Sequence, residues 1–167
     1  MIDKENERLR YNFRAKSLLD AGDLKQAATQ LPKYLNTPYE FYFTLLRKRG
    51  DKSKLLEIGA GMGENTGVLL SIFPKVHATD ISLESVKVMR KRFSDYDGFS
   101  AEVADMEKLP FNDESFDVVC SAGSLSYGDN AVVMNEIYRV LKQGGVMIVV
   151  DSLNNNPIYR FNRYLHY

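Results

Sequence analysis

The chain has 167 residues, of which 44% are hydrophobic and 26% are charged, and its formal net charge is zero. This length and composition are typical of one globular domain that is large enough to bury a core. The neutral charge balance argues against general nucleic-acid binding, which requires a large excess of Lys and Arg.

Three features bear on location. The apolar run at residues 146–150 is far too short to cross a bilayer, so we expect no transmembrane segment. Residues 1–7 are charged and lack the apolar core of a signal peptide. The single cysteine, Cys120, excludes an internal disulfide and fits a reducing compartment. We therefore expect a cytoplasmic protein.

The first third of the chain is predicted to be helical. A polar helix is expected at residues 3–20, a short one at 24–31, and a third at 40–49 that ends at Gly50. We expect residues 1–53 to form a helical lid or cap. Residues 1–54 carry 12 Lys and Arg against 7 Asp and Glu, a net charge of +5. The excess suits either an anionic partner or an ordinary solvated helix face.

From residue 54 onwards, strands alternate with helices. The strands are expected at 54–58, 76–80, 99–104, 116–121 and 146–150. The helices are expected at 64–73, 82–93 and 131–141, with Ser82 as an N-cap and Gly144-Gly145 closing the last one. This alternation predicts an α/β fold with a doubly wound, mainly parallel, Rossmann-like sheet over residues 54–152. A basic aromatic tail follows at 153–167.

A glycine-rich turn follows the first expected strand, where residues 55–63 read L-L-E-I-G-A-G-M-G. Three glycines at alternate positions let backbone N–H groups approach a ligand, and the next helix directs its positive end to the same place. A dinucleotide site requires G-x-G-x-x-G, but the third glycine of that pattern falls on Glu64 or on Thr66. The spacing therefore disfavours an NAD-dependent enzyme.

The E-x-G-x-G-x-G pattern resembles motif I of class I S-adenosylmethionine-dependent methyltransferases. Further segments in the family's order extend the resemblance over residues 50–152: D-M-E-K-L-P-F from Asp105 and E-I-Y-R-V-L-K-Q-G-G from Glu136. The resemblance implies S-adenosylmethionine as the cofactor, no metal, and methyl transfer to a small-molecule acceptor such as a metabolite, sugar or quinone. The N/D-P-P-Y/F sequence of nucleobase amino-methyltransferases is absent.

The resemblance also implies cofactor-binding residues at four strand ends, which converge in a doubly wound sheet. The glycine loop would hold the methionine moiety through Glu57, Gly59, Ala60, Gly61 and Gly63. Asp80 would accept hydrogen bonds from the ribose hydroxyls, and Ile81 would pack on the adenine. Asp105 and Met106 would contact the adenine edge, and Ser121 would lie at the same crevice. Purely structural roles in turns and helix ends remain alternatives for these residues.

The sequence offers few catalytic groups. A hydroxyl acceptor requires a base, and the candidates are Asp151 and Tyr127. We expect His77 to be packed inside its strand and Cys120 to belong to the core. Aromatic residues of the N-terminal segment are expected either to cover the cofactor or simply to pack, namely Tyr11, Tyr34, Tyr39 and Phe41.

Other readings stay open. Family members normally add two strands after the fifth, and we expect this chain to lack them and to expose a sheet edge that allows a homodimer. A regulatory or scaffold module that binds S-adenosylmethionine without catalysis is the alternative function. Tyr138 and Lys142 have the Tyr-x-x-x-Lys spacing of short-chain dehydrogenases, but they lie before the fifth strand without an evident Ser partner.

Overall fold

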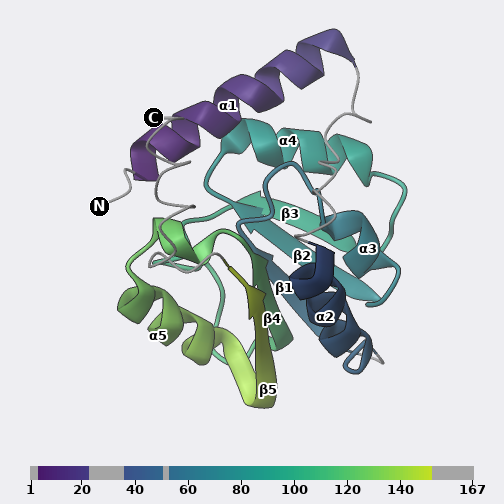
Figure 1. The fold of residues 1–167 in the computed structure, drawn as a ribbon, viewed down its shortest axis with the longest axis vertical. Helices are drawn as coiled ribbons and strands as arrows, with labels where there is room; N and C mark the ends of the chain where they lie inside the picture. The colour runs from purple at the N-terminus through teal and green to yellow at the C-terminus, as the bar shows by residue number, and fades with distance from the viewer. Residues whose placement is uncertain (1–3, 23–35, 51–52, 152–167) are drawn as a thin grey trace.

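The structure is a computed structural model that describes residues 4–22, 36–50 and 53–151 (Figure 1). The helix predicted at 24–31, Tyr34 and the tail at 153–167 lie outside the described residues. Within the described part, no helix combines the length and the hydrophobicity needed to cross a membrane.

A single sheet of five parallel strands forms the centre of the molecule, in the order β3-β2-β1-β4-β5. The strands are β1 (Lys54–Ile58), β2 (Lys75–Asp80), β3 (Phe99–Val103), β4 (Phe116–Ala122) and β5 (Leu141–Val150). The strand order reverses between β1 and β4, so the carboxyl ends of these strands form the switch point at which open α/β sheets bind ligands. The predicted doubly wound parallel sheet is confirmed.

Helices cover both faces of the sheet (Figure 1). One face packs against α2 (Asn36–Arg47), α3 (Thr66–Leu70) and α4 (Leu83–Arg92). The opposite face packs against α5 (Asn130–Val140), and a short 3-10 helix, η3 (Leu125–Tyr127), precedes it. The remaining helix, α1 (Lys4–Ala21), lies across α4 rather than on the sheet.

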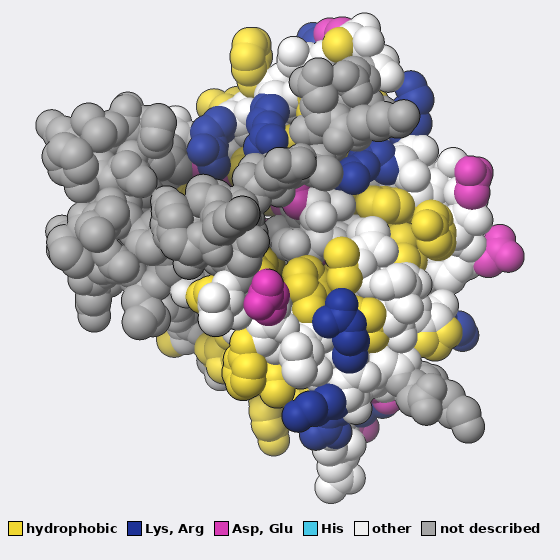
Figure 2. Space-filling view, turned by 45° about the vertical axis from the view of Figure 1, so that its right-hand side comes forward, with side chains coloured by type: hydrophobic (Ala, Val, Ile, Leu, Met, Phe, Trp, Pro, Cys, Tyr) yellow, Lys and Arg dark blue, Asp and Glu magenta, His cyan; other side chains and the backbone are white. Residues whose placement is uncertain are grey.

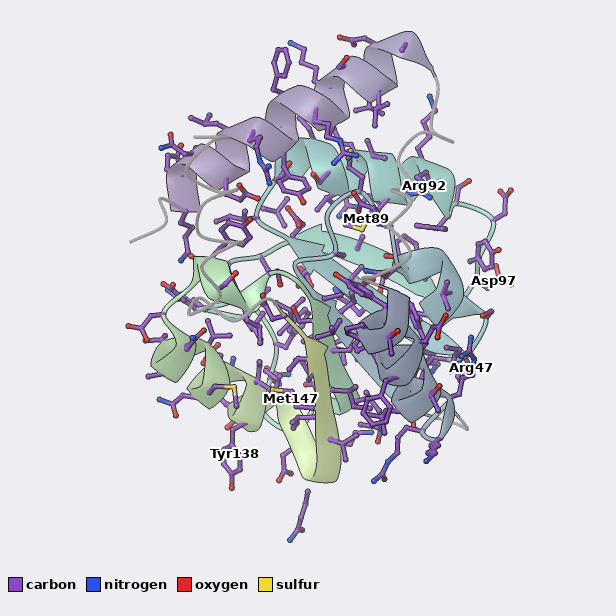
Figure 3. All side chains as sticks on the ribbon, viewed as in Figure 1. Arg47, Met89, Arg92, Asp97, Tyr138 and Met147 are labelled. Atoms are coloured by element: carbon purple, nitrogen blue, oxygen red, sulfur yellow. The ribbon has the colours of Figure 1, made fainter. Side chains whose placement is uncertain are left out.

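Side-chain directions follow from these layers (Figure 3). Met89 of α4 is fully buried and points towards the sheet, whereas Tyr138 of α5 is 84% exposed and points away from the molecule. Cys120 is fully buried in β4, as expected for a core residue. Neighbouring hydrophobic side chains of β1 face opposite sides of the sheet: Leu55 packs on the α2 side and Leu56 on the α5 side.

The end of α5 differs from the prediction. The helix stops at Val140, and Leu141 already has extended dihedral angles and begins β5. Gly144 and Gly145 therefore do not close the helix, and that prediction is wrong. They lie inside β5, where its register against β4 shifts, and Gly144 adopts a φ of +77° that favours glycine.

On the face shown in Figure 2, the Lys and Arg side chains of the described residues occur in several separate places, with Asp and Glu between some of them. This distribution agrees with the zero net charge of the chain. We see no single basic patch on the described part of this face.

Candidate functional site

A cavity of about 630 Å³, counting its open mouth, lies at the carboxyl ends of β1, β2 and β4. Its walls come from α1, from the loops after β1, β2, β3 and β4, and from η3. The lining residues are Lys4, Glu7, Tyr11, Ile58, Gly59, Asp80, Ile81, Ala104, Asp105, Met106, Ala122, Gly123, Ser124 and Tyr127. This cavity lies at the switch point of the sheet.

Backbone conformation and close contacts favour glycine at two positions of the glycine loop. Gly59 and Gly61 have φ angles of +64° and +58°, which L side chains rarely adopt. A Cβ on Gly59 would lie 2.3 Å from both Cβ and Oγ of Ser124. A Cβ on Gly61 would lie 2.7 Å from a carboxylate oxygen of Glu64 and 3.4 Å from the ring of Tyr11. Of these two glycines, Gly59 lines the cavity.

Asp80 connects this loop to the end of β2. Its Oδ2 accepts a hydrogen bond from Gly61 N at 2.8 Å, and its Oδ1 accepts one from Ser82 N at 2.8 Å. The side chain is buried apart from its contact with the cavity, and this burial raises the pKa of Asp80 to about 6 even though the two N–H groups lower it. A carboxylate held in this way can accept further hydrogen bonds from a polar ligand.

Glu57 lies behind the cavity wall rather than on it. It is 2% exposed and accepts a hydrogen bond from Thr66 Oγ1 at 2.6 Å, which ties the end of β1 to the start of α3. Burial raises the pKa of Glu57 to about 8. Ala60 and Gly63 also lie behind the wall: Ala60 N donates to Thr79 O at 2.9 Å, and Gly63 packs against the ring of Phe93.

The switch point itself is held by two serines. Ser121 is buried, and its Oγ lies 2.6 Å from Ser124 Oγ. Ser124 Oγ also donates a hydrogen bond to Ile58 O at 3.1 Å, and Ser124 lines the cavity while Ser121 does not. We did not predict Ser124 as a site residue, although its place three residues after Ser121 in the loop after β4 was a usable signal.

The loop after β3 carries the predicted adenine-binding residues Asp105 and Met106, which both line the cavity together with Ile81. Asp105 accepts hydrogen bonds from Lys4 Nζ at 2.8 and 2.9 Å and from Glu107 N at 3.0 Å. The predicted residues therefore lie at the cavity, and the sequence did not indicate that a lysine from α1 reaches them.

Helix α1 contributes three residues to the cavity, of which only Tyr11 was expected near the cofactor. Glu7 is buried and forms an ion pair with Arg10. Burial raises the pKa of Tyr11 well above its usual value, so the phenol stays protonated. Periodicity predicted the helix, but no local signal could show that its Lys4, Glu7 and Tyr11 side would meet the cavity.

The two candidate bases are placed differently. Tyr127 lines the cavity, whereas Asp151 is not among the lining residues and accepts a hydrogen bond from Ser126 N at 3.2 Å. His77 lies away from the cavity and contacts Glu102 and Ser100 at 2.8 and 2.6 Å. Burial lowers the pKa of His77, while Glu102 opposes that shift. Among the described residues, no cluster of His, Cys, Asp and Glu is arranged to hold a metal ion.

Comparison with known proteins gives consistent similarities. The family model for the methyltransferase domain matches residues 56–149. The chain is 36% identical over 115 residues to sterol 4-C-methyltransferase strm-1 of Caenorhabditis elegans, which covers 65% of the chain and 34% of that protein. It is 32% identical over 124 residues to ubiquinone/menaquinone biosynthesis C-methyltransferase UbiE of Desulfotalea psychrophila, which covers 70% and 50%. The chain thus spans half or less of the length of these relatives.

Among solved structures, the chain is similar to the PH0226 protein of Pyrococcus horikoshii OT3, with 25% sequence identity and a TM-score of 0.65. This similarity covers 79% of the chain and 65% of that protein.

Proposed function

Because the chain belongs to the methyltransferase domain family of class I enzymes, whose cofactor is S-adenosylmethionine, we propose that it transfers a methyl group from this cofactor to a small-molecule acceptor. The observation that carries the proposal is the cavity at the switch point, which combines exposed backbone at Gly59 with the buried carboxylate of Asp80. These two features match the needs of a cofactor that has both a compact polar end and a ribose.

The residues present fit S-adenosylmethionine. Gly59 lines the cavity, and Ser124 packs so closely against it that a Cβ would not fit there. The loop around Gly59 and Gly61 would hold the methionine end. Asp80 would accept hydrogen bonds from the ribose hydroxyls, since its two oxygens retain free lone pairs. Asp105 and Met106 would line the adenine, with Ile81 against one face of the ring. Glu57 and Ser121 would support the walls from behind.

S-adenosylmethionine supplies an activated methyl group, so the chain needs no nucleophile of its own. The work of its residues would be to orient the acceptor in line with the methyl group and to exclude water. Tyr127 is the better placed of the two candidate bases because it lines the cavity. Asp151 would instead hold the loop after β4 through Ser126 N.

The acceptor class can be proposed more narrowly. The two curated relatives described above are named for C-methylation in sterol and quinone chemistry. The cavity contains two tyrosine rings, Tyr11 and Tyr127, which suit an apolar, ring-bearing acceptor. We propose such an acceptor and propose that residues 1–53 act as a cap, since α1 supplies three residues of the cavity wall. A cytoplasmic location and a homodimer through the sheet edge also remain proposals.

The test is calorimetric titration of the full chain with S-adenosylmethionine, with NAD as the control ligand. Asp80→Asn should weaken binding by about tenfold or more, because a neutral amide replaces the acceptor of two charge-assisted hydrogen bonds. Asp97→Asn is the matched control, since Asp97 is exposed and lies outside the cavity (Figure 3). Wild-type affinity should also fall as the pH drops below about 6, where Asp80 becomes protonated.

Equal binding by the wild type and Asp80→Asn would contradict the assigned cofactor site. Binding followed by no formation of S-adenosylhomocysteine with sterol-like or quinone-like acceptors would favour the scaffold alternative instead. Assays that measure S-adenosylhomocysteine release decide between these outcomes.

A further inference from the structure

Lys4, close to the N-terminal end of α1, contacts the wall that would hold the adenine. Its Nζ lies 2.8 and 2.9 Å from the two carboxylate oxygens of Asp105 and 2.8 Å from Oε2 of Glu107. The three protons of one ammonium group thus face three oxygens of two carboxylates. Lys4 and Asp105 both line the cavity, so this contact lies inside the site rather than beside it.

The rest of α1 is held by different contacts. Asn12 Oδ1 accepts a hydrogen bond from Ser82 Oγ at 2.7 Å, just after β2. One helical turn later, Ala15 is fully buried in an apolar cluster with Met62 and Val88. The middle and the C-terminal part of the helix are therefore anchored on α4 and the glycine loop, whereas ion pairs hold the end that carries Lys4 (Figure 1).

The ion pairs of Lys4 are accessible to water. The side chains of Lys4, Asp105 and Glu107 are 28%, 40% and 29% exposed. Ion pairs of this exposure are weak because solvent screens the charges. A ligand that offers Asp105 a hydrogen-bond donor can therefore compete with Lys4, which would not hold for a fully buried pair.

In the proposed function Asp105 lies at the adenine edge, where the amino group of adenine is a hydrogen-bond donor. Lys4 and this amino group would therefore both donate to the same carboxylate. Its Oδ1 already accepts from Glu107 N as well as from Lys4. We propose that Lys4 competes with the adenine amino group for Asp105, so that this end of α1 gates the adenine end of the cofactor site. The inference rests on the proposed function, because it requires an adenine-bearing cofactor in this cavity.

The gate predicts that removing the charge of Lys4 improves cofactor binding. The test is calorimetric titration of the full chain with S-adenosylhomocysteine, which lacks the sulfonium charge and so isolates the adenine end from cation repulsion. Lys4→Met should bind about two- to fivefold more tightly than the wild type, the range expected for loss of a half-exposed competitor. Lys16→Met, an exposed lysine of the same helix outside the cavity, should bind like the wild type.

A second variant checks the mechanism. Glu107→Gln keeps an acceptor for Asp129 N, which Glu107 Oε1 binds at 2.8 Å, but it removes one of the two charges that attract Lys4. It should tighten binding in the same direction as Lys4→Met and by a smaller factor. Added salt should improve binding by the wild type more than binding by Lys4→Met, because salt weakens the competing ion pair.

Unchanged or weaker binding by Lys4→Met, with an unfolding temperature equal to that of the wild type, would contradict the proposed competition. Lys4 would then stabilise the wall of the cavity instead. If the wild type itself does not bind S-adenosylhomocysteine, the proposed function fails instead. The two failures are therefore distinguishable.

Discussion

Small side chains at the switch point let two loops approach more closely than larger residues would permit. Ser124 occupies the space that a Cβ on Gly59 would need, and its hydroxyl holds Ile58 O and Ser121 Oγ at once. The cavity wall is therefore formed by backbone and hydroxyl groups together. Its shape depends on a contact between residues that are more than 60 positions apart in the chain.

Gly59→Ala should abolish cofactor binding and lower the free energy of unfolding by more than about 2 kcal/mol. About 1 kcal/mol comes from the left-handed backbone alone, and the rest from the clash with Ser124. Gly144→Ala is the matched control, because Gly144 has a φ of +77° but no heavy atom within 4 Å of the new Cβ. Gly144→Ala should lose only the share of the free energy of unfolding that comes from the left-handed backbone, and it should bind the cofactor as tightly as the wild type does. Urea unfolding and calorimetry measure both quantities, and equal losses in the two variants would contradict the role of Ser124.

At the scale of elements, α5 holds the loop that follows the adenine wall. Arg139 donates to Leu109 O at 3.0 Å and to Phe111 O at 2.6 Å. Its other hydrogen bonds go to both carboxylate oxygens of Glu136 and to Asp113. The sequence suggested a structural role for Glu136 and Arg139, and their contacts agree with it. They fix the loop whose first residues are Asp105 and Met106.

Arg139→Lys should destabilise the fold by about 1–3 kcal/mol, because an ammonium group cannot replace the planar, multiply bonded guanidinium. It should also weaken cofactor binding modestly, through loss of order in the loop after β3. Tyr138→Ser, on the exposed side of the same helix, is the control and should change neither quantity. Urea unfolding at neutral pH gives the free energies. If Arg139→Lys were as stable as the wild type, the loop after β3 would keep its structure without the hydrogen bonds of Arg139.

Local signals predicted some elements better than others. Ser82 was expected as the N-cap of α4, and its Oγ accepts a hydrogen bond from Ser85 N at 3.1 Å. In contrast, α3 covers only Thr66–Leu70 rather than residues 64–73, because the chain before it is taken up by the glycine loop. The start of β5 was misplaced, since pairing with β4 extends the strand back to Leu141.

At the scale of the whole molecule, burial of carboxyl groups around the cavity reduces stability at high pH. Glu57 is fully enclosed, and its pKa of about 8 in the folded protein lies well above its usual value. Between the two values the folded state binds more protons than the unfolded state. The free energy of unfolding therefore decreases as the pH rises through this window. Above about pH 8, where Glu57 is ionised in both states, the contribution of Glu57 to this free energy is at its lowest.

Glu57→Gln should remove this pH dependence while keeping an oxygen acceptor for Thr66. Relative to the wild type, the variant should gain on the order of a few kcal/mol in the free energy of unfolding between about pH 5 and about pH 8. Glu40→Gln, at an exposed position of α2, should show no such gain. Denaturant unfolding across this range measures the difference. A difference that is constant with pH would mean that Glu57 is ionised in the folded protein.

The amino-acid sequence by itself determined the order and type of most elements, the parallel sheet and the glycine loop. These depend on short-range patterns: alternating apolar runs, glycine spacing, and acids at strand ends such as Asp80 and Asp105. Only the tertiary structure decided that Ser124 packs against Gly59, 65 residues away in the chain, and that Lys4 contacts Asp105, 101 residues away. Periodicity shows which residues share a helix face, but packing decides what that face meets.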